Sequence, residues 1–208
     1  MNPVRLKVCG ITDPDQGRVI ALMGADALGF ILAPRSPRYV APEELPRLLA
    51  GLPPLVKTVG VFVDRPKQEV LEIAKTYGLD LVQLHGQESP ADCRWLTQRG
   101  QAWIKAIRVG GAQDLEGLEG YGPGPFLLDT KNDKAQGGTG ETFDWSLARA
   151  FCRNRLVLLA GGLKPGNLQA AVQTVRPYGV DLNSGLETAP GVKDLEQVAQ
   201  AIKILRNR

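Results

Sequence analysis

The sequence predicts an α/β fold, a (β/α)8 TIM barrel in a single domain over residues 1–208. The first observation is a series of short apolar runs, each typical of a strand whose two faces are both covered. The eight runs are Val4–Val8, Ala27–Leu32, Val56–Val63, Asp80–Leu84, Ala102–Ile107, Phe126–Asp129, Leu156–Ala160 and Gly179–Asn183. The second observation is that each run leads into glycine or polar residues. In barrels of this type the active site lies at that end of the strands.

Segments with helical spacing of apolar residues separate the runs, which is the third observation. Proline stands near the start of several of them and glycine near the end, as expected at helix boundaries. The predicted helices are Asp13–Gly24, Pro42–Gly51, Pro66–Gly78, Pro90–Gly100, a short Ala112–Glu119, Trp145–Cys152, Pro165–Arg176 and Lys193–Asn207. An open doubly wound sheet is the alternative. No GxGxxG follows the first run, so the barrel is favoured.

Composition excludes several function classes. The formal net charge is only +3 and the basic residues are scattered, which disfavours a nucleic-acid partner. No apolar stretch approaches the roughly 20 residues that span a bilayer, and the N-terminus has no signal-peptide pattern. The three cysteines, Cys9, Cys93 and Cys152, have no CxxC spacing. We therefore expect no disulfide framework and no metal site, and a cytoplasmic location.

Residues 131–143 form the longest stretch without apolar periodicity. Long structureless loops in compact domains are usually functional. We expect a mobile loop here that follows the sixth strand and closes over the barrel mouth.

Three glycine-bearing turns in the last third of the chain predict a phosphate site. Glycine lets a backbone N–H approach a phosphate oxygen, and the loops after strands seven and eight commonly bind phosphate in such barrels. The alternative is that these glycines only permit tight turns. A phosphorylated small molecule is the expected ligand, and the predicted phosphate-binding residues are Gly138, Gly140, Gly161, Gly162, Ser184 and Gly185.

Two residues at strand ends are candidates for acid–base catalysis. Cys9 and Lys7 are two apart on one strand, so they face the same side, roughly 6–7 Å apart. A neighbouring ammonium should lower the pKa of Cys9 and make it a usable base; the alternative is a buried structural cysteine.

Asp129 closes an apolar strand, where a carboxylate is costly unless it meets solvent, a partner or substrate. It is the candidate acid, with a helix cap or a salt bridge to Lys131 as the alternative. Asp181 has the same ambiguity.

Short motifs over essentially the whole chain resemble one family. They include Lys7–Thr12, Ala25–Phe30, Ser36–Val40, Val59–Val63, Val82–Gly86, Leu127–Asp129, Gly137–Gly140 with Phe143–Trp145, Leu159–Leu163 with Pro165 and Asn167, and Gly179–Asp181 through Ser184–Gly185, Glu187 and Pro190–Gly191. In this order they resemble the phosphoribosylanthranilate isomerases, which catalyse the third step of tryptophan synthesis from chorismate.

The resemblance implies an Amadori rearrangement of N-(5-phosphoribosyl)anthranilate to 1-(2-carboxyphenylamino)-1-deoxyribulose 5-phosphate, without a cofactor or metal. By matching position, Asp129 is the general acid on the ribose ring oxygen and Cys9 the general base at ribose C2. Arg38 holds the anthranilate carboxylate, and Asp181 helps to position the substrate.

The matching motifs and the loop after the eighth strand also contain Gln83, His85 and Asn183. Gln83 and His85 are placed among the substrate-binding residues, and we expect His85, the only histidine, to be a structural or supporting neighbour of Gln83. The family often has Ser-Ser-Gly where this chain has Asn183-Ser184-Gly185.

Two other functions stay open. An enzyme such as an indoleglycerol-phosphate synthase-like lyase also needs a barrel and a phosphate site. Ring closure with decarboxylation resembles chemistry that a Lys and Glu pair carries out. The first strand here offers Lys7 beside Cys9 and no carboxylate. A non-catalytic barrel would have no need of both Cys9 and Asp129. The sequence leaves open whether the chain is a monomer or a homodimer.

Overall fold

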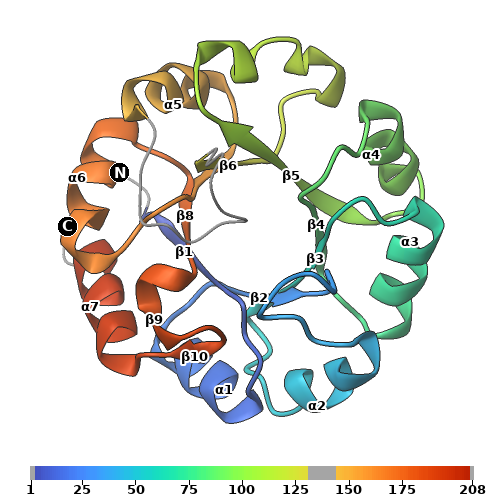
Figure 1. Ribbon diagram of the computed structural model, residues 1–208, viewed down its shortest axis with the longest axis vertical. Coiled ribbons are helices and arrows are strands. Elements are labelled where there is room, and N and C mark those ends of the chain that lie inside the picture. Colours follow the sequence, from blue (N-terminus) through green and yellow to red (C-terminus); the bar gives the residue numbers. More distant parts are fainter. Residues whose placement is uncertain (1–2, 131–143, 207–208) are drawn as a thin grey trace.

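The predicted barrel is confirmed. The computed structural model describes residues 3–130 and 144–206, and within these residues eight parallel strands pair in chain order, with β8 returning to β1 to close the barrel (Figure 1). The predicted loop over 131–143 lies outside the described residues. The barrel strands are β1 (Arg5–Cys9), β2 (Ala27–Ile31), β3 (Lys57–Phe62), β4 (Leu81–Leu84), β5 (Ala102–Val109), β6 (Phe126–Thr130), β7 (Val157–Leu159) and β8 (Gly179–Leu182).

Helices surround the barrel, as the view down its axis in Figure 1 shows. Most begin at the signals seen in the sequence; Ser89, for example, accepts a hydrogen bond from the Asp92 N–H at the start of α4. The described helices are α1 (Pro14–Met23), α2 (Leu45–Leu49), α3 (Lys67–Thr76), α4 (Pro90–Thr97), α5 (Trp145–Phe151), α6 (Pro165–Val175) and α7 (Leu195–Arg206). In the described part of the chain, no helix is long and apolar enough to cross a membrane.

Side chains alternate between the two faces of each strand and form two layers of core. Outward-facing residues such as Leu6 and Val8 pack under the helices. Inward-facing residues fill the barrel, where a separate apolar cluster consists of Val59, Ile104, Ala106, Leu127, Leu158 and Ala160. The inward positions nearer the carboxyl ends of the strands carry the polar candidates. The polar candidates therefore lie at the end of the barrel where active sites of this fold are found.

The structure corrects three predicted helices. The predicted helix Ala112–Glu119 is wrong: two 3-10 turns, Ala112–Leu115 and Leu118–Tyr121, flank Gly117, whose φ of 67° ends any helix there. Pro42–Gly51 divides into a 3-10 turn, Pro42–Glu44, and the short α2.

The last helix begins at Leu195 rather than at Lys193. Val192–Lys193 forms strand β10, which pairs with β9 (Glu187–Ala189) in an antiparallel hairpin across Pro190-Gly191. The Asp194 side chain then caps the helix by accepting hydrogen bonds from the N–H groups of Glu196 and Gln197. The hairpin places Lys193 above the carboxyl end of the barrel, next to the loop that follows β8.

Candidate active site at the carboxyl ends of the strands

The inward-facing positions bring the predicted catalytic and substrate-binding residues together. Lys7 lies level with Asp181 on β8, and Cys9, one step further toward the mouth, lies level with Gly29 on β2. Gln83 faces the same interior from β4, and Asp129 does so from the end of β6. Since these strands belong to one closed barrel, the predicted acid and base face a common space.

The base side of the site is built around Cys9. The Lys7 Nζ atom donates a hydrogen bond of 2.9 Å to Asp181 Oδ1, and both side chains are buried. Gly29 leaves the room for this arrangement, because a Cβ there would lie 2.7 Å from Cys9 Sγ and 3.0 Å from Lys7 Nζ. A larger residue on β2 would therefore displace the thiol or the ammonium.

The expected lowering of the Cys9 pKa is wrong for this structure. Burial raises the pKa of the Cys9 thiol, and the ammonium groups of Lys7 and Lys193 oppose that shift without reversing it. Burial likewise raises the pKa of Asp181, with Lys7 opposing. Cys9 is thus predominantly a thiol at neutral pH, and its thiolate is the minor form. The sequence shows that Lys7 is adjacent, but not how completely both groups are withdrawn from water.

The acid side of the site is a chain of three side chains. Asp129 is partly exposed, and its Oδ1 accepts a hydrogen bond from the Thr130 N–H. Its Oδ2 lies 3.3 Å from His85 Nε2, while His85 Nδ1 lies 2.8 Å from Gln83 Nε2. Nδ1 of His85 therefore faces the Gln83 amide, and Nε2 is the ring nitrogen that faces Asp129.

His85 is therefore the neighbour of Gln83 that the sequence suggested, and it also contacts the predicted acid. Gln83 Oε1 is buried and has no hydrogen-bond partner among the described residues. The alternative partner for Asp129, Lys131, lies outside the described residues.

The predicted phosphate side lies at the ends of β7 and β8. Gly161 and Gly162 both have positive φ, 81° and 64°, a conformation that favours glycine at each position. α6 begins just after them, and the Asn167 side chain bonds both the Gly162 carbonyl and the Lys164 N–H. Gly185 packs so closely on the Leu163 carbonyl oxygen that a side chain would collide with it.

These contacts place the loops after β7 and β8 side by side at the N-terminal end of a helix, a geometry suited to an anion. Gly138 and Gly140 lie outside the described residues. The role of all six predicted phosphate-binding residues stays a prediction.

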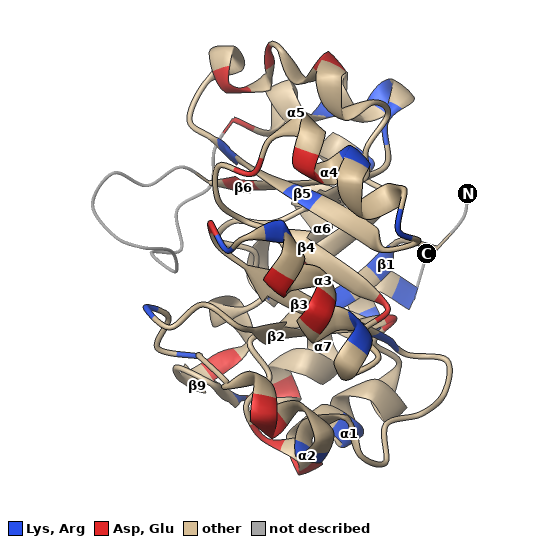
Figure 2. Cartoon of the chain, turned by 90° about the vertical axis from the view of Figure 1, so that its right-hand side faces the viewer, with Lys and Arg blue, Asp and Glu red and all other residues tan. Residues whose placement is uncertain are grey.

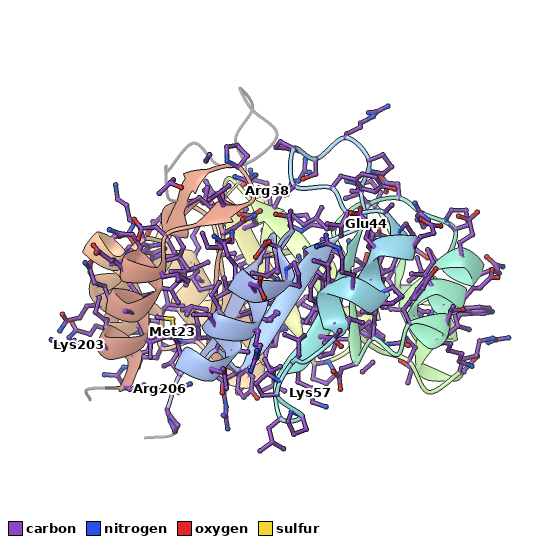
Figure 3. The ribbon with its side chains drawn as sticks, turned by 90° about the horizontal axis from the view of Figure 1, so that it is seen from below. Met23, Arg38, Glu44, Lys57, Lys203 and Arg206 are labelled. Carbon is purple, nitrogen blue, oxygen red and sulfur yellow. The ribbon has the colours of Figure 1, made fainter. Side chains whose placement is uncertain are left out.

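Arg38 lies at the same end of the barrel, in the loop after β2. Figure 3 shows it beside the β9–β10 hairpin, with Lys57 and Arg206 at the opposite end. Its Nε and Nη2 atoms hold both carboxylate oxygens of Glu187 at 2.6–3.0 Å. Among the described residues, Nη1 of Arg38 donates no hydrogen bond, so that side of the guanidinium can meet a second carboxylate.

Lys193 is the residue of this site that the sequence reasoning missed. Its side chain is fully buried, and Nζ contacts Glu187 Oε1 at 2.6 Å and Asn183 Oδ1 at 2.9 Å. Burial lowers the pKa of Lys193, and Glu187 opposes that shift. Burial raises the pKa of Glu187, but Arg38 and Lys193 outweigh it, so that the pKa is lowered and the carboxylate stays ionised. A signal was present in the Pro190-Gly191 turn, which predicts a hairpin rather than a helix start.

The other cysteines pack away from this site. Cys93 on α4 is buried, and burial raises its pKa to about 12. Burial also raises the pKa of Cys152, in the 3-10 turn after α5, to about 11. Within the described ranges there is no group of three or more His, Cys, Asp and Glu residues that could hold a metal ion.

Comparison with known proteins agrees with the geometry of this site. Residues 6–204 match the family model described as N-(5'-phosphoribosyl)anthranilate isomerase. A protein of that name from Geobacter sulfurreducens is 46% identical over 200 residues, covering 96% of this chain and 97% of the relative. The crystal structure of phosphoribosyl anthranilate isomerase from Thermotoga maritima superimposes with a TM-score of 0.92 at 41% identity, covering 99% of this chain and 100% of the other.

A further solved structure carries a ligand. It is a phosphoribosyl anthranilate isomerase in complex with reduced 1-(o-carboxyphenylamino)-1-deoxyribulose 5-phosphate, with a TM-score of 0.88, 39% identity and coverage of 99% of this chain and 100% of that one. The match of family model, relatives and fold extends over nearly the whole chain, and the chain belongs to the N-(5'-phosphoribosyl)anthranilate isomerase family.

Proposed function

We propose that this protein catalyses the Amadori rearrangement of N-(5-phosphoribosyl)anthranilate to 1-(2-carboxyphenylamino)-1-deoxyribulose 5-phosphate, a step of tryptophan biosynthesis. The observation that carries the proposal is the pair Cys9 and Asp129, which are the last residue of β1 and the last but one of β6 and face one barrel mouth. Arg38 and the loops after β7 and β8 border the same mouth. These are the groups that a substrate with a carboxylate, a sugar ring and a phosphate requires.

Asp129 is proposed as the general acid. It donates a proton to the ribose ring oxygen while the bond between that oxygen and C1 breaks, and the anthranilate nitrogen and C1 form an iminium. The contact with His85 fixes the Asp129 carboxyl group, and its partial exposure allows it to meet the ring oxygen.

Cys9 is proposed as the general base. It removes the proton from C2 of the iminium, whose positive charge makes that proton acidic, and the electron pair neutralises the nitrogen. The resulting enol-amine becomes the amino ketone when C1 gains a proton and the C2 hydroxyl loses its proton to form the carbonyl. Because the resting group is a thiol, some of the barrier lies in forming the thiolate beside Lys7.

Binding roles follow from the placement of the remaining residues. Arg38 presents the Nη1 side of its guanidinium to the anthranilate carboxylate, and Asp181, held by Lys7, orients the sugar from the barrel interior. Gln83 and His85 support the acid side. The backbone groups at Gly161, Gly162, Ser184 and Gly185 receive the phosphate, and the reaction needs no cofactor.

The direct test generates N-(5-phosphoribosyl)anthranilate in situ and follows the loss of its fluorescence on adding the protein. Positioned acid–base groups typically contribute about 100- to 10,000-fold in rate. Asp129→Asn and Cys9→Ser should therefore each lower kcat by at least about 100-fold, with the fold and the affinity for a phosphorylated product analogue retained.

The pH–rate profile adds a second criterion, because the limb due to the base should disappear in Cys9→Ser. Near-wild-type kcat in Asp129→Asn would refute the mechanism. Release of carbon dioxide from a carboxyphenylamino sugar phosphate would favour the lyase instead, and binding without turnover would favour the non-catalytic barrel.

The setting of the enzyme is also proposed. Figure 2 shows acidic and basic residues interspersed along the chain rather than gathered at one side, which supports a small-molecule substrate and no nucleic-acid partner. We place the enzyme in the cytoplasm, as a monomer or a homodimer. Both states are represented among its relatives, because generated monomers of the dimeric Thermotoga maritima isomerase have been crystallised.

A further inference from the structure

The mechanism above gives Lys193 no contact with the substrate, although its ammonium opposes the raised pKa of Cys9. It is nevertheless among the most completely buried charges near the site. Its ammonium makes three contacts: Glu187 Oε1 at 2.6 Å, Asn183 Oδ1 at 2.9 Å and the Asn183 carbonyl at 3.4 Å. A lysine that is fully withdrawn from water is costly unless its contacts compensate for the lost hydration. The arrangement therefore calls for an explanation beyond surface pairing.

Arg38, Glu187 and Lys193 form a cluster of three charged side chains. Arg38 and Glu187 form a bidentate pair, with Nε bound to Oε1 and Nη2 to Oε2, and their charges cancel. Lys193 adds a third charge, with its Nζ 2.6 Å from Oε1 of the same carboxylate. The cluster Arg38–Glu187–Lys193 is therefore cationic by one charge, while Arg38–Glu187 alone would be neutral.

Close packing joins this cluster to the base side of the site. A Cβ on Gly10 would lie 2.7 Å from Arg38 Cδ and 2.7 Å from Asn183 Oδ1, so only glycine at that position lets the two side chains lie where they do. Gly10 follows Cys9 directly, and Asn183 accepts the hydrogen bond of Lys193. A change at Lys193 would reach Arg38 through Glu187, which contacts both side chains.

We propose that Lys193 is a positioning residue for carboxylate recognition. It holds Glu187 so that the guanidinium of Arg38 is fixed by two hydrogen bonds, and it supplies the charge that prevents Glu187 from neutralising Arg38. The substrate carboxylate then meets a cluster with one net positive charge. This inference rests on the proposed function, which supplies the carboxylate.

The test compares two ligands that differ only in that carboxylate. The probes are reduced 1-(o-carboxyphenylamino)-1-deoxyribulose 5-phosphate and its phenylamino counterpart without the ring carboxylate, with affinities measured by calorimetry. Lys193→Met should lower the affinity for the first ligand about 10- to 100-fold, the size of effect expected when a hydrogen bond to a charged group is lost. The affinity for the second ligand should change less than about twofold. In turnover, KM should rise more than kcat falls.

A second variant tests charge rather than packing. Glu187→Gln together with Lys193→Met restores the single positive charge and should recover most of the lost affinity for the carboxylate ligand. Lys193→Gln removes the charge but keeps a hydrogen-bond donor on a shorter side chain, and serves if the Met variant does not fold. Lys203→Met is the matched control, since Lys203 is an exposed residue of α7.

Equal weakening of both ligands would overturn the proposal and leave Lys193 a structural residue, as would unchanged affinity for the carboxylate ligand. Failure of the double variant to recover affinity would also refute the charge argument. If the wild-type protein binds neither ligand, it is the proposed function that fails, so the two failures are distinguishable.

Discussion

Gly29 offers a sharp test of the geometry around the proposed base. A methyl group at this position in β2 would lie 2.7 Å from Cys9 Sγ, 3.0 Å from Lys7 Nζ and 3.2 Å from Cys9 Cα. Non-bonded carbon atoms prefer about 3.5–4.0 Å, so the Sγ atom must move by about 1 Å in Gly29→Ala. A misplacement of about 1 Å can cost about 100-fold in rate. We therefore expect kcat to fall by about 100-fold although no catalytic side chain has been replaced.

Stability should change by a smaller, separable amount. Overpacking a buried site typically costs about 1–3 kcal/mol, and replacing glycine by alanine recovers about 0.4–1 kcal/mol through the unfolded chain. The free energy of unfolding of Gly29→Ala, measured in urea, should therefore drop by about 1–2 kcal/mol, leaving the enzyme folded under assay conditions.

The adjacent strand provides a matched control. Gly60 on β3 also has no room for a Cβ, but its contacts are Leu79 and Phe62 on the outer face of the barrel. Gly60→Ala should cost a similar or smaller amount of stability and leave kcat near wild type. If Gly29→Ala keeps full activity, or if both variants lose activity alike, Cys9 does not occupy the proposed reactive position.

Two further predictions test the phosphate side and an acid-sensitive cap. In Gly185→Val the new side chain should collide with the Leu163 carbonyl and push the loop after β8 away from the loop after β7, which should weaken binding of inorganic phosphate and raise KM. Ser184→Ala should do less because the backbone N–H remains. Unchanged phosphate affinity in the Val variant would remove the proposed site. Hydrogen bonds from Lys67 and Ser89 lower the pKa of Asp92 to about 2, so its contribution to stability is fully present above its unfolded pKa of about 3.9 and is lost as the pH falls toward 2. The stability difference between wild type and Asp92→Asn, measured by urea unfolding, should shrink over that window, and a difference independent of pH would contradict the assignment.

The fold could be predicted because its signals are local. Each barrel strand is an apolar run that ends in glycine or polar residues, and these features depend on short stretches of sequence. The errors lie where a tertiary contact overrides a local pattern. Ala112–Glu119 has helical composition, but Gly117 adopts a left-handed conformation and divides the segment into two turns. Lys193 resembles the start of a helix, but its strand is already paired with Glu187–Ala189.

The site could be predicted only as far as position on a strand determines it. Strand alternation and strand ends place Cys9, Asp129 and Asp181 at one mouth, and the structure agrees. The sign of the Cys9 pKa shift could not follow in the same way. It depends on whether the attraction of Lys7 exceeds the cost of burial, and both effects grow as the two groups are withdrawn from water. Only the three-dimensional structure shows that burial, with the nearby carboxyl group of Asp181, prevails over Lys7.

Lys193 shows the limit of such reasoning most clearly. Its contacts reach residues 6 and 10 positions away in sequence, and through Glu187 they reach Arg38, 149 positions from Glu187. Nothing in the local pattern connects an arginine after the second strand to a lysine beyond the eighth. The closed barrel does so, because β1 pairs with both β2 and β8, and the loops after those strands become neighbours. Closure of the sheet therefore brings Arg38, Glu187 and Lys193 into one cluster, and a break in the pairing of β1 with β8 should separate Arg38 from both of its supporting residues.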